Sequence, residues 1–268
     1  MTARFDCADP GQRTAGVEAA ITALRNGELA VLPTDTVYGL AADAFSPVAV
    51  AMLFSARGRN RSIPPTVLVG TARAAAALAD DLGAFGQDLI DEFWPGALTL
   101  VFRASPTLLW DLGDTKGTVA LRMPLHPVTL EVLKQTGPLA VSSANRHGHP
   151  AAITADAAQE QLGESVSVYL DNGPSTENIP STILDLTGTI PKVLRAGAIY
   201  VDRLRMVASV IADNEHYTDG ASPTADGATA ASPAFGSSAA DFKPAAPHPL
   251  AGSGDPAGPA AGEPPSGA

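Results

Sequence analysis

The chain has 268 residues, of which 45% are hydrophobic, so it carries enough apolar material for a sizeable buried core. Its formal net charge of -11 at pH 7 argues against a general nucleic-acid-binding surface, because such binding depends mainly on neutralising phosphates, but it leaves a local basic groove open. The single cysteine excludes an internal disulfide, and neither an N-terminal leader pattern nor a run of roughly 18 apolar residues occurs. We therefore expect a soluble, cytoplasmic protein with no membrane role.

The first part of the chain predicts a helix, a strand and a second helix. The first helix should have its N-cap at Thr14 and end at Gly27. Its apolar positions recur at helical spacing: Val17, Ile21 and Leu24. "ELAVLP" then predicts a strand. Ser46 followed by Pro47 is typical of a helix start, and that helix leads directly into a run of arginines.

The middle of the chain alternates further strands with helices. Six runs predict strands: "TVLVG", "ALTLVF", "TVALRM", "PLAVSSAN", "VSVYLD" and "STILDLTG". "HPVTLEVLKQTG" and "TADAAQEQLG" predict helices, the second capped by Thr154. This order predicts an α/β fold with a single twisted, open and mostly mixed sheet, flanked by helices.

The composition changes near residue 214. Residues 214–268 consist mainly of Ala, Gly, Pro and Ser and have no sustained apolar period. Such a segment cannot bury enough surface to offset its ordering entropy. We therefore expect one domain over residues 1–213 and a disordered tail over residues 214–268.

Two polar stretches follow predicted strands. "LPTDTVYGLAADA" places Thr34, Asp35 and Thr36 after a strand, and "AVSSANRHGHP" places Ser143 and Asn145 after another. Both stretches have the hydroxyl, amide or carboxyl groups that orient a small polar ligand. An ordinary turn that satisfies its own backbone accounts for them equally well.

The arginines point to an anionic ligand. Arg57, Arg59 and Arg61 alternate in "SARGRNRSIPP", while Arg122 and Arg195 end apolar runs. A buried guanidinium needs an anion, and two sources are open: an Asp or Glu of the fold, or the phosphates and carboxylate of a ligand. With the neutral Ser and Asn loops, the arrangement suits a nucleotide together with a small acid.

Other site types have little support in the sequence. It contains neither G-x-x-x-x-G-K-[ST] nor G-x-G-x-x-G, so neither a P-loop nor a Rossmann phosphate site is indicated. His147 and His149 lack an accompanying Cys or carboxylate pattern and fit a solvated loop better than a metal site. We predict no protein-held metal.

A family resemblance rests on several separate motifs. "PTDTVYGLAADA", "RGR", "FWPGALTLV", "TVALRMPLHP", "PLAVSSAN", "STILDLTG" and "VLRAG" occur here in the order found in the YrdC-type threonylcarbamoyl-AMP synthases. The chain resembles the actinobacterial members of that family over most of the predicted domain.

The resemblance implies a reaction, a fold and partners. Enzymes of this kind combine ATP, L-threonine and bicarbonate into L-threonylcarbamoyladenylate and release pyrophosphate, with Mg²⁺ accompanying ATP. A downstream threonylcarbamoyl-transfer complex then modifies the adenosine beside the anticodon of certain tRNAs, which makes tRNA a candidate partner. The implied fold is a twisted α/β sheet with a central basic groove. The alternative is a non-catalytic nucleotide- or tRNA-binding YrdC-like module.

The resemblance also implies roles for individual residues. Arg57 and Arg59 are the candidate catalytic residues. The implied threonine-binding residues are Thr36, Arg122, Ser143 and Ser181. The implied ATP-binding residues are Arg59, Ile63, Thr118, Asn145, Ile153 and Arg195. Two positions depart from the family: Arg57 replaces its usual lysine, and His147 replaces its usual serine.

Overall fold

The computed structural model describes residues 2–176 and 178–212. The predicted tail, residues 214–268, lies outside the described residues, so its disorder and the domain boundary at 213 stay predictions. None of the helices in the described ranges is both long and apolar enough to cross a membrane.

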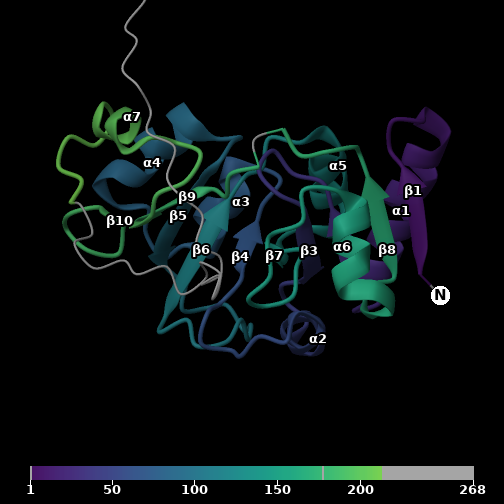
Figure 1. Cartoon of the computed structure of the whole chain (residues 1–268). Coiled ribbons are helices and arrows are strands. Elements are labelled where there is room, and N and C mark those ends of the chain that lie inside the picture. The colour runs from purple at the N-terminus through teal and green to yellow at the C-terminus, as the bar shows by residue number, and fades with distance from the viewer. Residues whose placement is uncertain (1, 177, 213–268) are drawn as a thin grey trace, which may run out of the picture. The chain divides into compact units, whose positions relative to one another are not determined.

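Ten strands of the described chain form one mixed sheet (Figure 1). Their bounds are β1 Ala3–Asp6, β2 Ala30–Leu32, β3 Gly39–Asp43, β4 Thr66–Leu68, β5 Leu98–Arg103, β6 Thr118–Arg122, β7 Leu139–Ser143, β8 Val168–Asp171, β9 Thr182–Asp185 and β10 Lys192–Arg195. The strand order is β1-β8-β2-β3-β7-β4-β6-β5-β9-β10. β1–β8, β2–β8, β4–β6 and β5–β9 are parallel pairs, and the other neighbours are antiparallel. The predicted mixed, open sheet is confirmed.

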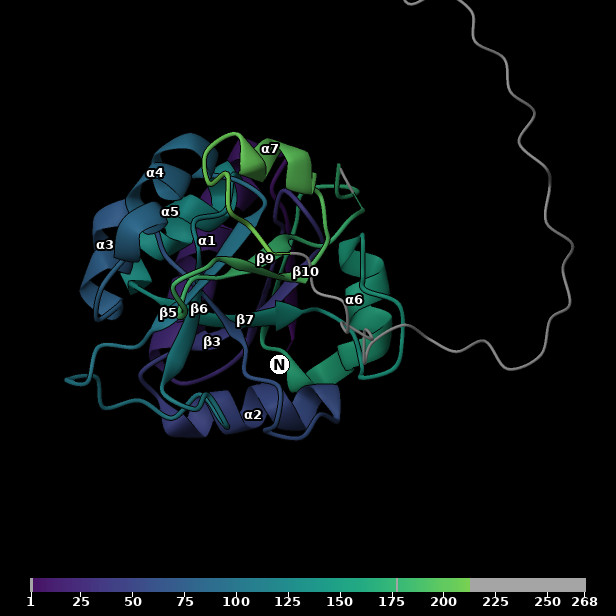
Figure 2. The same cartoon turned by 90° about the vertical axis from the view of Figure 1, so that its left-hand side faces the viewer.

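Helices flank this sheet (Figure 2). Their bounds are α1 Pro10–Arg25, α2 Pro47–Arg57, α3 Ala72–Leu78, α4 Gly83–Phe93, α5 Pro127–Thr136, α6 Ala155–Leu162 and α7 Val201–Arg205, with a 3₁₀ turn η1 at Gly163–Ser165. The side chains of β2 alternate between two clusters, because successive residues of a strand point to opposite faces. Ala30 and Leu32 pack with α1 and α5, whereas Val31 packs with α2 and α6. A third cluster joins α3, α4 and α7 to the β6–β5–β9–β10 part of the sheet.

The local signals predicted some helix ends correctly and one wrongly. Ser46 caps α2 by accepting a hydrogen bond from the backbone N–H of Ala49, as predicted. The predicted cap of α1 at Thr14 is wrong. Asp9 is the N-cap and accepts from the N–H of Gln12 at 2.8 Å, with proline at the first helical position. Thr14 lies within the first turns, where its hydroxyl donates to the carbonyl of Pro10.

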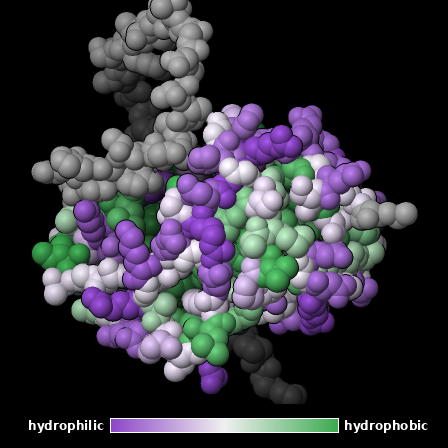
Figure 3. Space-filling model, turned by 90° about the horizontal axis from the view of Figure 1, so that it is seen from below, coloured by the Kyte–Doolittle hydropathy of each residue, from purple (hydrophilic) through white to green (hydrophobic). Residues whose placement is uncertain are grey.

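The loop between β5 and β6 is fastened to α2. Phe45, just before α2, stacks on Trp110 with ring centroids 5.6 Å apart. Gly113 has φ +93°, and a Cβ there would lie 2.6 Å from the carbonyl oxygen of Arg61, so the close approach requires glycine. The α2 side of the molecule, seen from below in Figure 3, mixes apolar and polar side chains, and the large exposed apolar residues of α2 are Val48 and Met52.

Cys7 follows β1 and is only 4% exposed. Burial raises the pKa of its thiol from 9.0 to about 11, which lowers the thiolate fraction near pH 8 by about a hundredfold. We expect Cys7 to react with iodoacetamide at pH 8 at least a hundred times more slowly in the native protein than in urea. Mass spectrometry of a labelling time course measures this ratio. Equal rates in the two states would contradict the burial of Cys7.

Candidate active site

Several segments far apart in the sequence line one cavity of about 340 Å³. The lining comes from the loop before β3, the end of α2, the segment around β4, strand β5, the end of β6, the end of β7 with the loop after it, β9 with the residues before it, and the end of β10. Its arginines are Arg57, Arg59, Arg122 and Arg195. No Asp or Glu of the described chain lines the cavity. In a chain with a net charge of -11, this is a strongly cationic local environment.

Sheet pairing brings the two predicted polar loops together. β3 and β7 are antiparallel, with Gly39 opposite Ser143, so the loop that precedes β3 lies beside the loop that follows β7. A Cβ on Gly39 would lie 2.7 Å from Cγ1 of Val141. Glycine is therefore needed for this close approach of the two strands.

Arg122 ends β6 and is 6% exposed. Its Nε donates to the carbonyl of Gly96 at 2.9 Å, one terminal nitrogen to the hydroxyl of Thr36 at 2.9 Å, and the other to the carboxylate of Asp35 at 2.6 Å. Burial lowers the pKa of Arg122, and the charge of Asp35 opposes that shift. An ion pair within the fold is thus present. The guanidinium still has further N–H donors and lines the cavity, so a ligand carboxylate remains compatible with it.

Thr34 and Thr36 form a small hydroxyl cluster beside Arg122. Both are buried, and their hydroxyl oxygens lie 3.1 Å apart. Thr34 donates to the carbonyl of Val37 at 2.7 Å, which fixes the turn. Asp35 accepts the N–H of Leu125 at 3.0 Å as well as the Arg122 bond. Polar groups at the ends of β6 and β2 are therefore held in one arrangement.

Arg57, the last residue of α2, is 4% exposed and binds the loop after β7. Its Nε donates to the carbonyl of Asn145 at 2.9 Å, and its terminal nitrogens donate to the side chains of Ser142 and Asn145. Burial, with a smaller effect from Arg59, lowers the pKa of Arg57 to about 10. The group therefore stays cationic at neutral pH. The planar fork suits these spread acceptors better than a lysine ammonium would.

Arg59 and Arg61 are directed differently. Arg59 donates to the hydroxyl of Ser142 at 3.4 Å and lines the cavity. Arg61 forms an ion pair with Asp111 and lies over the ring of Phe54, 5.7 Å from its centroid. It is absent from the cavity lining. Arg59 therefore faces the cavity, whereas Arg61 contacts residues outside its lining.

Ser181 and Arg195 occupy another part of the cavity lining. Arg195 donates to the carbonyl of Ser181 at 2.7 Å and to its hydroxyl at 3.0 Å. That hydroxyl also lies 2.8 Å from the hydroxyl of Thr99, a buried polar residue of β5. The predicted threonine-binding serine and the predicted ATP-binding arginine are therefore in direct contact.

Most predicted site residues lie together, and two do not. Those that line the cavity are Thr36, Arg57, Arg59, Ile63, Arg122, Ser143, Asn145, Ser181 and Arg195. Thr118 begins β6, at the other end of the strand from Arg122, and its hydroxyl donates to the carbonyl of Thr115. Ile153 is also absent from the lining and bonds through its carbonyl to the N–H of Ser175. Sequence reasoning missed Thr99, whose signal was a polar residue inside an apolar strand.

The described residues contain no cluster of three or more His, Cys, Asp or Glu able to hold a metal ion. Another cavity, of about 450 Å³, lies beside α2 and includes Arg57 and Arg146 in its lining. Of the predicted site residues it contains only Arg57, so we assign the site to the arginine-lined cavity.

The sheet and the cavity define an α/β protein with a groove built for anions. The sequence profile of the Sua5–YciO–YrdC family, described as telomere recombination, matches residues 22–197. The chain belongs to this family, which confirms the resemblance seen in its motifs.

Individual relatives are similar to this chain in sequence or in structure. A Mycobacterium tuberculosis protein, named provisionally as a threonylcarbamoyl-AMP synthase, is 53% identical over 78% of this chain and 97% of its own length. The Bacillus subtilis threonylcarbamoyl-AMP synthase is 34% identical over 73% of this chain and 57% of its own length. Pyrococcus abyssi Sua5, solved in complex with L-threonine, has a TM-score of 0.73 at 29% identity, covering 80% of this chain and 62% of that one.

Proposed function

We propose that this protein synthesises L-threonylcarbamoyladenylate from L-threonine, bicarbonate and ATP and releases pyrophosphate. The observation that carries the proposal is the cavity itself, which combines buried arginines and hydroxyl groups without a lining carboxylate. Such a lining matches a ligand set with phosphates and a free carboxylate. The name of the mycobacterial relative and the threonine complex of P. abyssi Sua5 support the same assignment.

The residues divide into two groups in this proposal. Arg122 and Thr36 bind the carboxylate and hydroxyl ends of threonine, with Ser143 and Ser181 completing its site. Arg59, Asn145 and Arg195 bind ATP, and Ile63, Ile153 and Thr118 contribute further nucleotide contacts on the strength of the family resemblance alone. We assign the catalytic role to Arg57 and Arg59, because their guanidinium groups supply positive charge beside Asn145 and Ser142, respectively.

The reaction needs positioning and charge neutralisation more than a covalent nucleophile. Bicarbonate takes up a proton and loses water to give carbon dioxide, and the threonine amine attacks its carbon and releases a proton to give a carbamate. A carbamate oxygen then attacks the α-phosphate, and the bond to the departing pyrophosphate breaks. Arginines held at the phosphates stabilise the charge that moves onto that leaving group.

Mg²⁺ enters this scheme with the nucleotide. Among the described residues no carboxylate lines the cavity, so these residues offer Mg²⁺ no dedicated carboxylate ligand there. We propose that ATP phosphates and water hold the ion, which makes MgATP the substrate. A downstream transfer complex and tRNA as a partner remain predictions from the family resemblance, and a cytoplasmic location remains a prediction from the sequence itself.

Pyrophosphate release tests the reaction directly. We expect release only when ATP, L-threonine and bicarbonate are all present, because each forms part of the product. A coupled phosphate assay with single omissions measures it, and mass spectrometry identifies the adenylate. ATP binding without pyrophosphate release under complete conditions would instead favour the non-catalytic binding module.

A further inference from the structure

A buried tyrosine links the two sides of the proposed site. Tyr38 lies between the hydroxyl cluster of Thr34 and Thr36 and the start of β3, and its side chain is fully buried. Its N–H donates to the carbonyl of Ala152 at 3.0 Å, and its carbonyl accepts from the N–H of Ala144 at 2.8 Å. Ala144 lies between Ser143 and Asn145, which we assign to threonine and ATP, respectively. The backbone of Tyr38 therefore joins the loop before β3, which carries Thr36 and is called here the threonine-binding loop, to the loop after β7, which carries Asn145 and is called the nucleotide-binding loop.

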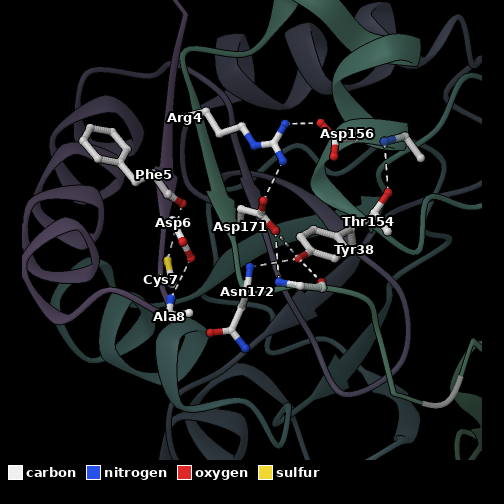
Figure 4. Close-up of polar contacts among 12 residues, drawn as sticks. Arg4, Phe5, Asp6, Cys7, Ala8, Tyr38, Thr154, Asp156, Asp171 and Asn172 are labelled. Carbon is white, nitrogen blue, oxygen red and sulfur yellow. Dashed lines mark hydrogen bonds and ion pairs between the residues drawn. The ribbon is translucent and has the colours of Figure 1, made fainter.

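The hydroxyl of Tyr38 extends this link to the end of β8 (Figure 4). It donates to the carbonyl of Gly173 at 2.6 Å and accepts from the N–H of Asn172 at 3.0 Å. The N–H of Ser175, in the same segment, donates to the carbonyl of Ile153. The phenol thus fixes the turn after β8 to the loop that carries Thr36.

The N-terminal strand holds the outer end of this network. Asp171 accepts from the N–H of Gly173 at 3.0 Å and from Arg4 at 2.6 Å, and Arg4 also pairs with Asp156 at the start of α6. Figure 4 shows Arg4 between the two carboxylates. Arg4 precedes residues 22–197, the part matched by the family profile. This segment therefore adds a contact that the matched region does not itself contain.

We propose that Tyr38 is a positioning residue, which aligns the threonine-binding and nucleotide-binding loops through its bonds to the 172–173 turn, and that Arg4 braces this turn through Asp171. Tyr38 takes no proton and contacts no reacting atom in this scheme. Its effect is geometric, because small displacements between bound reactants carry large rate penalties. The inference rests on the proposed function for its kinetic consequence, whereas the structural link stands independently of it.

The chain provides a matched control in Tyr169. Tyr169 is also fully buried, and its hydroxyl donates to a glycine carbonyl, that of Gly163, at 2.8 Å. This bond joins β8 to the end of α6 and touches neither predicted ligand-binding loop. Tyr38→Phe and Tyr169→Phe each remove one buried hydroxyl and should lower the melting temperature, Tyr38→Phe somewhat more because its hydroxyl also accepts the N–H of Asn172.

Steady-state kinetics of these variants test the proposal. We expect Tyr38→Phe to lower kcat/KM for threonine about tenfold, while Tyr169→Phe stays within about twofold of the wild type. Arg4→Gln should give a smaller loss in the same parameter, with Arg13→Gln as its control because Arg13 pairs with Glu131 between α1 and α5. Unchanged kinetics in Tyr38→Phe, or equal losses in Tyr38→Phe and Tyr169→Phe, would overturn the proposal.

Hydrogen exchange separates this inference from the reaction itself. The N–H groups of Tyr38 and Ala144 should exchange faster in Tyr38→Phe than in Tyr169→Phe, whether or not the wild type releases pyrophosphate. Wild-type inactivity with this exchange pattern would remove the proposed function and leave the link intact. Unaltered exchange of both amides would refute the link. If Tyr38→Phe does not fold, the comparison of Arg4→Gln with Arg13→Gln by the same two measurements decides the matter.

Discussion

Replacing Arg122 by alanine is expected to reduce threonine-dependent pyrophosphate release by roughly 100-fold or more, because two charge-assisted hydrogen bonds to the threonine carboxylate would be lost. The same change leaves Asp35, whose side chain is 15% exposed, without its cation. We therefore also expect a stability loss of about 3 kcal/mol. Pyrophosphate assays over a range of threonine concentrations, at temperatures where circular dichroism shows a folded variant, measure the catalytic part.

Asp35→Asn distinguishes substrate binding from a purely structural ion pair. It leaves Arg122 as a buried cation without its partner, so it should destabilise the fold to a comparable degree. If Arg122 binds threonine, the KM for threonine should stay the same or fall, because the substrate carboxylate then becomes the main anion for this guanidinium. Equal catalytic losses in Asp35→Asn and Arg122→Ala would show that Arg122 acts only by holding Asp35.

Arg59→Ala should weaken ATP binding by about 10- to 150-fold, the range that corresponds to one charge-assisted hydrogen bond of about 1.5–3 kcal/mol. Arg59 lines the cavity beside Ser142, where a phosphate oxygen would meet it. Arg61→Ala is the matched control, since Arg61 pairs with Asp111 outside the cavity lining. Isothermal titration with a non-hydrolysable ATP analogue measures both affinities. The phosphate assignment fails if the two variants bind the analogue equally well.

Much of the sheet was predictable because its strands are short apolar runs that end in polar residues. The run that contains β6 ends at Arg122, and the one that contains β7 ends at Ser143, so both site positions stood out locally. β3 escaped prediction because "GLAAD" consists largely of small residues without the β-branched side chains that mark strands. The cap of α1 was misplaced although Asp9 followed by Pro10 has the same pattern as Ser46 followed by Pro47.

The contacts within the site depended on long-range geometry. The sequence left two partners open for Arg122, a carboxylate of the fold or one of a ligand. The structure contains the first, with Asp35 at a sequence separation of 87 residues, and leaves room for the second. No local pattern signals such a pair. Likewise, the contact between Ser181 and Arg195 follows from the pairing of β9 with β10, which motif order alone does not determine.

The strand order has a consequence for how copies of this protein meet in solution. An open sheet ends in strands with unpaired backbone groups, which are potential templates for aggregation. Here the outermost strands, β1 and β10, have four residues each, and charged side chains occupy both: Arg4 and Asp6 on one, Lys192 and Arg195 on the other. A register shift between Val193 and Arg195 further disturbs the second edge. Pairing two such edges would bury charge for few hydrogen bonds, so the residues that brace the fold also discourage edge-to-edge association.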